Sequence, residues 1–216
     1  MAKRVGVIGS GDVGRELADG FLKHGYEVMI GSRDPEKLAD WKERGGEHAS
    51  LGTMAEAAEF GDLVVLAVKG AAAEHAVELC GPAALAGKTV LDATNPIAEA
   101  PPDHGVLRFF TTLDESLMER LQRLAPEARF VKCFSCIGSA LMVNPDLGGQ
   151  RPTMFICGDS DEAKQETAEV LAQFGHEPCD MGGAQSARAI EPLCILWCIP
   201  GFLRNEWTHA FKLLRQ

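Results

Sequence analysis

A glycine cluster close to the start of the chain has the residue types and the spacing to hold a phosphate group. Residues 9–14 read Gly-Ser-Gly-Asp-Val-Gly; they follow the β-branched run KRVGVIG and open a segment with apolar residues at helical spacing. In a strand–turn–helix unit, three glycines so placed allow a tight turn, close approach of the backbone to a pyrophosphate, and close packing of helix on strand. The N–H groups and dipole of the helix favour the anion. A tight turn without a ligand is the alternative. The residues expected to bind the pyrophosphate are Gly9, Ser10, Gly11, Asp12, Val13 and Gly14.

The next strand ends without the acid that a dinucleotide site usually carries. Residues 25–35 read GYEVMIGSRDP, so Gly31 stands where an Asp or Glu would bind the ribose hydroxyls of NAD. The hydroxyl of Ser32 and the guanidinium of Arg33 follow, and together they suit a phosphate dianion. This pattern predicts NADP rather than NAD, with the 2′-phosphate at these two residues. The alternative is that Arg33 is a solvated charge. Asp34 is expected to cap the next helix, with its carboxylate turned away from the phosphate.

The surrounding pattern alternates strand-like and helix-like segments. Helices are expected over about 12–24, over 35–44 after the Asp34-Pro35 start, and after the capping-box pair Thr53 and Glu56. The apolar run DLVVLAV is typical of a parallel strand covered on both faces. Such alternation indicates an α/β fold of the Rossmann type, a doubly wound, mainly parallel sheet.

The C-terminal part of the chain has a different character. Residues 184–216 read mostly as helix, with an interruption at Pro200-Gly201. We therefore expect an NADP-binding domain over 1–180 and a helical extension over 181–216 that packs on this domain or on a second subunit.

Charge and hydropathy exclude several classes of partner. The 216 residues carry a net charge of −10, which argues against binding to nucleic acid or to an anionic membrane surface. The most apolar run, LCILWCIPGFL over 193–203, is 11 residues long, which is too short to span a bilayer. With no export signal at the N-terminus, a cytoplasmic location and no membrane partner are expected.

Cysteine and histidine show no pattern of a metal centre. Seven cysteines are most simply buried reduced thiols. Cys133 and Cys136 have the spacing of a redox dithiol, and with Cys194 and Cys198 they could supply four thiolates, but 57 residues separate the pairs. No metal site is expected, and the redox dithiol stays as an alternative.

These stretches resemble a known family over most of the chain. GSGDVG with GYEVMIGSRDP is similar to the NADP-dependent reductases of the deazaflavin coenzyme F-420, and also to the cytoplasmic oxidoreductase domain of the six-transmembrane ferric and cupric reductases. The resemblance continues in the same order through LVVLAV, VLDATNPI, FVKCFSCIGSAL, TMFICGDSDEAK and DMGGAQSARAIEPL.

The resemblance implies hydride transfer between NADP(H) and a flavin-like ring. It places the nicotinamide near the ends of later strands, at Val68 and Lys69 and at Thr94, Asn95 and Pro96. Asn95 suits a hydrogen bond to the carboxamide, although an Asn-Pro turn that only ends a strand is the alternative. Hydride transfer needs orientation and exclusion of water, so no catalytic acid, base or nucleophile is expected.

The electron acceptor is the least determined part of this interpretation. Where relatives carry an F-N-[TV] tripeptide, this chain has Phe-Ser-Cys over 134–136. A deazaflavin or flavin is the expected second substrate, and a quinone or ferric chelate is an alternative. An imine or β-hydroxyacid dehydrogenase usually has a longer helical domain, and a non-catalytic NADPH sensor is a further rival. The apolar tail suggests a homodimer. Candidates for the acceptor pocket are Phe134, Ile137, His104 and Trp197.

Overall fold

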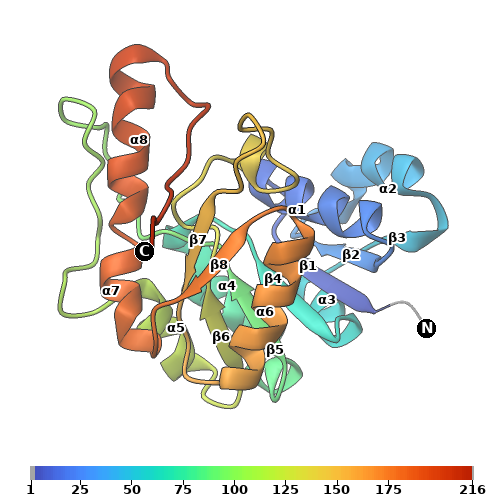
Figure 1. The fold of residues 1–216 in the computed structure, drawn as a ribbon. Coiled ribbons are helices and arrows are strands. Elements are labelled where there is room, and N and C mark those ends of the chain that lie inside the picture. The colour runs from blue at the N-terminus through green and yellow to red at the C-terminus, as the bar shows by residue number, and fades with distance from the viewer. Residues whose placement is uncertain (1–2, 216) are drawn as a thin grey trace.

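A parallel sheet forms the centre of the molecule. The computed structural model describes residues 3–215. Its main sheet has six strands in the order β3-β2-β1-β4-β5-β6, all parallel (Figure 1). This order turns back at β1 and β4, which is the topological switch point of a Rossmann fold. The predicted fold class is confirmed. The strands are β1 (Arg4–Ile8), β2 (Glu27–Gly31), β3 (Ala49–Gly52), β4 (Leu63–Leu66), β5 (Thr89–Asp92) and β6 (Arg129–Lys132).

Two further strands lie beyond β6. β7 (Thr153–Ile156) and β8 (Glu177–Asp180) pair in parallel with each other. A short antiparallel bridge joins them to the main sheet, because the amide of Lys132 donates to the carbonyl of Cys157 at 2.9 Å.

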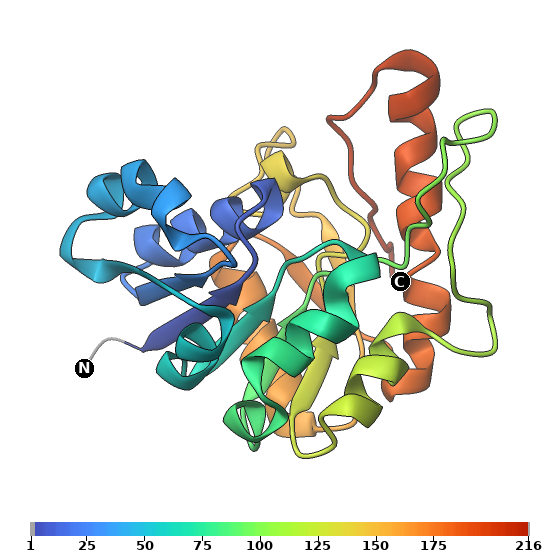
Figure 2. The same cartoon turned by 180° about the vertical axis from the view of Figure 1, so that it is seen from behind.

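Helices cover both faces of the sheet, as the two opposite views in Figures 1 and 2 show. α1 (Asp12–Lys23) and α6 (Asp161–Gln173) pack on one face, and α3 (Met54–Phe60), α4 (Ala73–Cys80) and α5 (Leu117–Leu124) pack on the other. Each face has its own buried cluster of apolar side chains. Short 3-10 helices occur at Pro35–Leu38, Gly46–His48, Gly70–Ala72, Pro82–Leu85, Ser139–Leu141 and Ala184–Ser186.

The helix expected over 35–44 is divided, and Asp34 does not cap it. A 3-10 turn over Pro35–Leu38 precedes α2 (Ala39–Gly45), and the Asp34 side chain makes no capping bond. Its carboxylate instead pairs with Lys37 at 2.6 Å, while its amide donates to Ser32 Oγ at 3.1 Å. The capping prediction is wrong because a salt bridge within the first turn takes the carboxylate. The capping box of Thr53 and Glu56 is confirmed.

The C-terminal segment also departs from expectation. α7 (Ala187–Ile190) leads into α8 (Leu193–Arg204), which continues through Pro200 without a break. Proline there removes one hydrogen-bond donor in the last two turns of the helix. After Asn205, which ends α8 in a left-handed conformation, residues 206–215 return along the helix and are not helical. The prediction of a mostly helical tail is therefore confirmed over 184–204 and wrong for 206–215, and the break expected at 200–201 is absent.

The helical run Ala184–Arg204 is longer than the apolar run seen in the sequence. It has 21 residues with a mean hydropathy of 1.3, long and apolar enough to cross a membrane, and about a third of its most apolar window is buried. A core helix of a globular protein meets the same criterion. The expectation that this segment is too short to span a bilayer does not hold. The division into units over 1–180 and 181–216 stays a prediction.

Candidate functional site

The glycine turn after β1 leaves its backbone open on one side only. Gly9 has a φ of +122°, and a Cβ there would lie 2.3 Å from the carbonyl oxygen of Ala67. A Cβ on Gly14 would lie 2.2 Å from the carbonyl oxygen of Gly9, so helix α1 can approach the turn only through glycine. Around Gly11, in contrast, no atom lies within 4 Å of the added Cβ. This open space beside the start of α1 fits a pyrophosphate that meets the backbone amides.

The strand β2 ends at a position that has no room for an acid. A Cβ on Gly31 would lie 2.8 Å from the Cβ of Ala57 and 2.9 Å from the Cα of Met54. Helix α3 therefore excludes any side chain here. The absence of the ribose-binding acid has a packing cause that the sequence did not reveal.

A cavity of about 730 Å³ extends from the glycine turn past the end of β2. Ser10 Oγ and Ser32 Oγ lie 3.2 Å apart in it, and Arg33 lies exposed on its wall. In a chain with a net charge of −10, this wall gathers basic groups, which favours an anion locally. Asp34 also lines the cavity, next to its partner Lys37. The basic side chains of the lining are Arg15, Arg33, Lys37, Lys69 and His75.

Three of these basic residues were missed by the sequence analysis. Arg15 follows Asp12 by three positions in the first turn of α1, which is a weak signal of exposure toward the turn. Lys37 lies in the turn after Pro35, close to the expected phosphate. His75 comes from α4, and no local pattern connects it with the site.

A second cavity of about 650 Å³ continues the first along the carboxyl ends of the strands. Gly11, Val68 and Lys69 line both cavities. Apart from Asp12, Lys69, Asn95 and Glu99, the lining is glycine and small to medium apolar residues, with the segment 97–100 as its outer wall. Small side chains leave room for a flat ring.

Asn95 offers an unused acceptor at this cavity. Its Nδ2 donates to the carbonyl oxygen of Ser135 at 3.0 Å. Its Oδ1 is buried and has no hydrogen-bond partner among residues 3–215. The backbone of Asn95 also packs on Gly70, where a Cβ would lie 1.9 Å from its carbonyl oxygen. An amide oxygen without a partner fits the amino group of a nicotinamide carboxamide.

The structure brings together most of the expected cofactor residues but not all of them. Of the expected set, Gly9 to Val13, Ser32, Arg33, Val68, Lys69 and Asn95 line one or both cavities. Gly14, Thr94 and Pro96 lie buried behind these walls.

The four candidates for the acceptor pocket do not line either cavity. Phe134, Ile137 and Trp197 are buried in the core. Phe134 has a φ of +57° and packs edge-on against His176. The side chain of His104 is 97% exposed at the tip of the loop 98–113. These two cavities give no support to the four candidates, which stay predictions: Trp197 packs against the C-terminal tail, and the loop carries His104 outward.

The two cysteines at 133 and 136 lie in an environment that disfavours redox chemistry. Cys133 and Cys136 are both buried. Burial raises the pKa of Cys133 well above its usual value and that of Cys136 to about 12. Since the thiolate is the reactive form, burial disfavours the state that redox chemistry needs. Within residues 3–215, no group of three or more His, Cys, Asp and Glu side chains is arranged to hold a metal ion.

Comparison with known proteins agrees with this geometry. The profile of the family described as NADP oxidoreductase, coenzyme F420-dependent, matches residues 4–96. The F420-dependent NADP reductase of Methanothermobacter marburgensis is 31% identical, over 95% of this chain and 96% of that protein. A crystal structure from Arthrobacter sp. FB24, described as a candidate F420-dependent NADP reductase, has a TM-score of 0.90 and 32% identity, with 100% of both chains covered.

Membrane-protein relatives match over part of their length. The metalloreductase STEAP3 of Rattus norvegicus is 35% identical over 94% of this chain, which corresponds to 39% of that protein. This chain thus spans about two fifths of the length of that relative. The match to the reductase from Methanothermobacter marburgensis, in contrast, covers nearly the whole of both proteins. The chain therefore belongs to the family of coenzyme F420-dependent NADP oxidoreductases.

Proposed function

We propose that this protein transfers hydride between NADP(H) and a deazaflavin or flavin-like ring. The observation that carries the proposal is the continuous groove formed by the two cavities. One end of the groove has hydroxyl and basic groups, and the other has small apolar residues and a free amide oxygen. This polarity matches a dinucleotide with a phosphorylated adenosine at one end and a reactive ring at the other.

Each part of the groove has a separate role in this proposal. The turn over 9–13 holds the pyrophosphate, and Ser32 with Arg33 holds the 2′-phosphate. Asn95 orients the carboxamide, and Val68 lines the part of the groove that receives the ring. NADPH, when bound, supplies the hydride. The chain contributes orientation and a water-poor wall, which is what this reaction requires of a protein.

The 2′-phosphate assignment is tested with Arg33→Ala. We expect this variant to lose ~1–3 kcal/mol of NADPH binding, because a charge-assisted contact disappears, while NADH binding is nearly unchanged. Titration of both cofactors by calorimetry measures the difference. Arg44→Ala is the matched control, because Arg44 is exposed on α2 and does not line the cavity. Equal losses for NADPH and NADH in the Arg33 variant would contradict the assignment.

The acceptor is identified by NADPH oxidation against a panel of a deazaflavin, a flavin, a quinone and a ferric chelate. The proposal expects the deazaflavin or the flavin to give the highest rate. A quinone or chelate as best acceptor would favour the alternative that the likeness to metalloreductases suggests. Tight NADPH binding with no turnover would favour a non-catalytic sensor.

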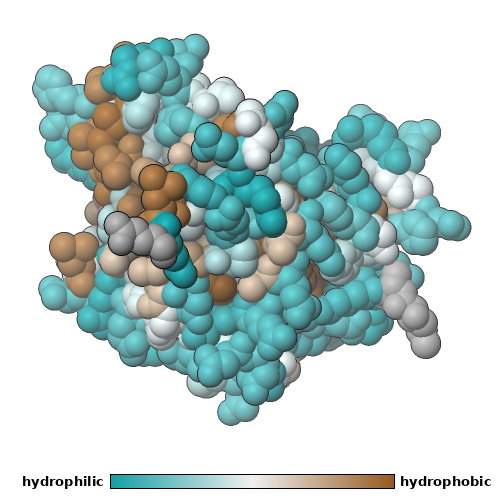
Figure 3. Space-filling view, viewed as in Figure 1, coloured by the Kyte–Doolittle hydropathy of each residue, from teal (hydrophilic) through white to brown (hydrophobic). Residues whose placement is uncertain are grey.

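A homodimer and a cytoplasmic location belong to the same proposal. Helix α8 exposes Leu196, Phe202 and Leu203, and Figure 3 shows the resulting hydrophobic surface. A second copy of the chain would cover this surface. Light scattering with size-exclusion chromatography measures the assembly, and a monomer at micromolar concentration would contradict the dimer.

A further inference from the structure

A fully buried ammonium group, that of Lys132, contacts the residue that precedes Asn95 in the chain. The side chain of Lys132, at the end of β6, has no exposed surface. Its Nζ lies 2.7 Å from Asp92 Oδ2 and 3.0 Å from Glu191 Oε1, and it donates to the carbonyl oxygen of Thr94 at 2.8 Å. The ammonium therefore contacts three oxygen atoms: it forms ion pairs with the two carboxylates and donates a hydrogen bond to the carbonyl of Thr94.

Thr94 is held by this cluster at three atoms. Its amide and its hydroxyl both donate to Asp92 Oδ1, at 2.9 and 2.6 Å. Its carbonyl oxygen accepts from Lys132. That carbonyl belongs to the same planar peptide unit as the amide of Asn95. The cluster thus fixes the direction in which the chain enters Asn95.

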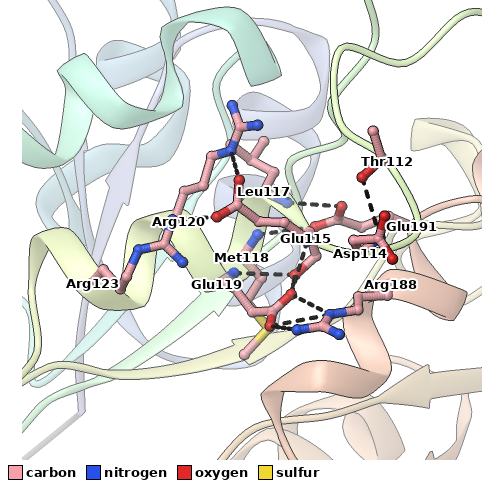
Figure 4. Close-up of polar contacts among 11 residues, drawn as sticks. Thr112, Asp114, Glu115, Leu117, Met118, Glu119, Arg120, Arg123, Arg188 and Glu191 are labelled. Carbon is pink, nitrogen blue, oxygen red and sulfur yellow. Dashed lines mark hydrogen bonds and ion pairs between the residues drawn. The ribbon is translucent and has the colours of Figure 1, made fainter.

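The third member of the cluster comes from the C-terminal extension. Glu191 lies between α7 and α8, and its carboxylate accepts from the amides of Leu117 and Met118, both at 3.0 Å, at the start of α5 (Figure 4). One side chain therefore connects the extension, the start of α5 and the ammonium of β6.

Net stability is a poor explanation for this cluster. Burial by itself would lower the pKa of Lys132, but the charges of Asp92 and Glu191 outweigh it and raise the pKa, so the lysine stays charged. Two carboxylates face one ammonium, and the amides at the start of α5 offset the second negative charge. Apolar residues of similar volume commonly give equal or greater stability than a buried ion pair. Apolar side chains have no donor, however, so they cannot hold the carbonyl of Thr94 in one direction.

We infer that Lys132 and Glu191 are positioning residues that fix the Thr94–Asn95 peptide for the nicotinamide and make the C-terminal extension a working part of the site. The inference rests on the proposed function, since it needs NADPH in the groove with its nicotinamide at Asn95. Neither side chain lines a cavity, so both act through Thr94 and Asn95.

The test compares Glu191→Gln with Arg188→Gln. Arg188 in α7 pairs with Glu119 in α5, so the control variant also loosens the contact between extension and α5 but leaves Lys132 and Thr94 untouched (Figure 4). Two ligands are titrated: 2′,5′-ADP, which fills only the adenosine end, and NADPH, whose nicotinamide fluorescence reports the other end. For Glu191→Gln we expect unchanged 2′,5′-ADP affinity, an altered emission of bound NADPH, and an NADPH affinity about fivefold weaker. The control variant should behave as wild type with both ligands.

A double-mutant cycle shows whether the effect passes through Asn95. If it does, Glu191→Gln should cause no further loss in an Asn95→Ala background, because coupled residues are not additive. Full additivity would overturn the inference. So would equal behaviour of Glu191→Gln and Arg188→Gln, or an Asn95→Ala variant that leaves the NADPH emission unchanged.

A second variant covers the case in which Glu191→Gln does not fold. Glu191→Asp keeps the charge but shortens the side chain, and we expect the same altered emission with a smaller loss of affinity. Wild-type emission from this variant would overturn the inference.

Failure of the proposed function gives a different result in these titrations. In that case wild type itself shows no preference for 2′,5′-ADP over 5′-ADP, and the inference fails with it.

Discussion

At the residue scale, single glycines decide where a ligand can lie. Gly14 and Gly31 have backbone or side-chain atoms within 3 Å of the position of a Cβ, so they serve the packing of helices on the sheet. Gly11 has no such atom near it, so its lack of a side chain leaves open space in which a ligand can lie. The glycine pattern in the sequence does not distinguish these roles, but the spacing of the surrounding atoms does.

This difference predicts opposite phenotypes for two alanine variants. Gly11→Ala should fold with wild-type stability and lose ~1–3 kcal/mol of NADPH binding, about five- to 150-fold in affinity, because the methyl group meets the pyrophosphate. Gly14→Ala should lose ~1–3 kcal/mol of folding stability, because its Cβ overlaps the carbonyl of Gly9. Urea unfolding and NADPH titration of both variants measure the two effects. A Gly11→Ala variant that binds NADPH as well as wild type would place the pyrophosphate elsewhere.

At the scale of elements, capping boxes set the starts of two helices on the same face of the sheet. Thr53 with Glu56 begins α3, and Ser116 with Glu119 begins α5. Both pairs satisfy amides that a helix start leaves free. Glu119 has a second role, since it also pairs with Arg188 of α7 and so joins α7 to α5.

This double role predicts an acid-dependent loss of stability. The hydrogen bond from Arg188 lowers the pKa of Glu119 to about 2. A carboxyl with a lowered pKa in the folded state contributes stability above its unfolded pKa of about 4.3, and that contribution is lost as the pH falls through about 2. We expect Arg188→Gln to flatten the pH dependence of unfolding in this range. Urea titrations between these pH values check it, and an unchanged slope would contradict the assignment.

At the scale of the whole molecule, the C-terminal segment packs against the loop 98–113 and reaches back to β7. α8 stands beside the loop 98–113 in both Figures 1 and 2, and Gly105 of this loop packs against Leu203. The returning tail then covers α8, where Trp197 Nε1 donates to the carbonyl oxygen of His209 at 2.9 Å. Further along the tail, the carbonyl oxygen of Phe211 accepts from the amide of Thr153 at 2.9 Å. The tail therefore connects α8 with β7.

Trp197 is the side chain that holds this arrangement. It is 6% exposed and packs on Gly138, where a Cβ would lie 2.6 Å from the indole. We expect Trp197→Ala to cost ~3–5 kcal/mol of unfolding free energy, as for other large aromatic side chains removed from a core. Leu214→Ala, at a residue that is 84% exposed, should change stability by less than ~0.5 kcal/mol. Thermal or urea unfolding measures both, and a small effect at Trp197 would contradict a structural role of the tail.

Local signals gave correct predictions where the physics is local. The capping pair at Thr53 and the glycine turn at 9–14 depend on neighbours within a few residues, and the structure shows both as expected. The predictions for Asp34 and Pro200 were wrong for two different reasons, a competing partner within the same turn and packing between distant parts of the chain. Lys37 takes the carboxylate of Asp34, and packing of the extension carries α8 past its proline.

The sequence by itself determined the fold class from the alternation of strands and helices. It also determined the glycine turn at 9–14 and the serine–arginine pair after β2, because each depends on the order of residues along one strand–turn–helix unit. Only the tertiary structure decided why no acid stands at Gly31, which basic side chains join Arg33, and that Lys132 meets Glu191. The physical reason is distance along the chain. Glu191 comes 59 positions after Lys132, and no periodicity records a contact that exists only after the extension packs on the sheet.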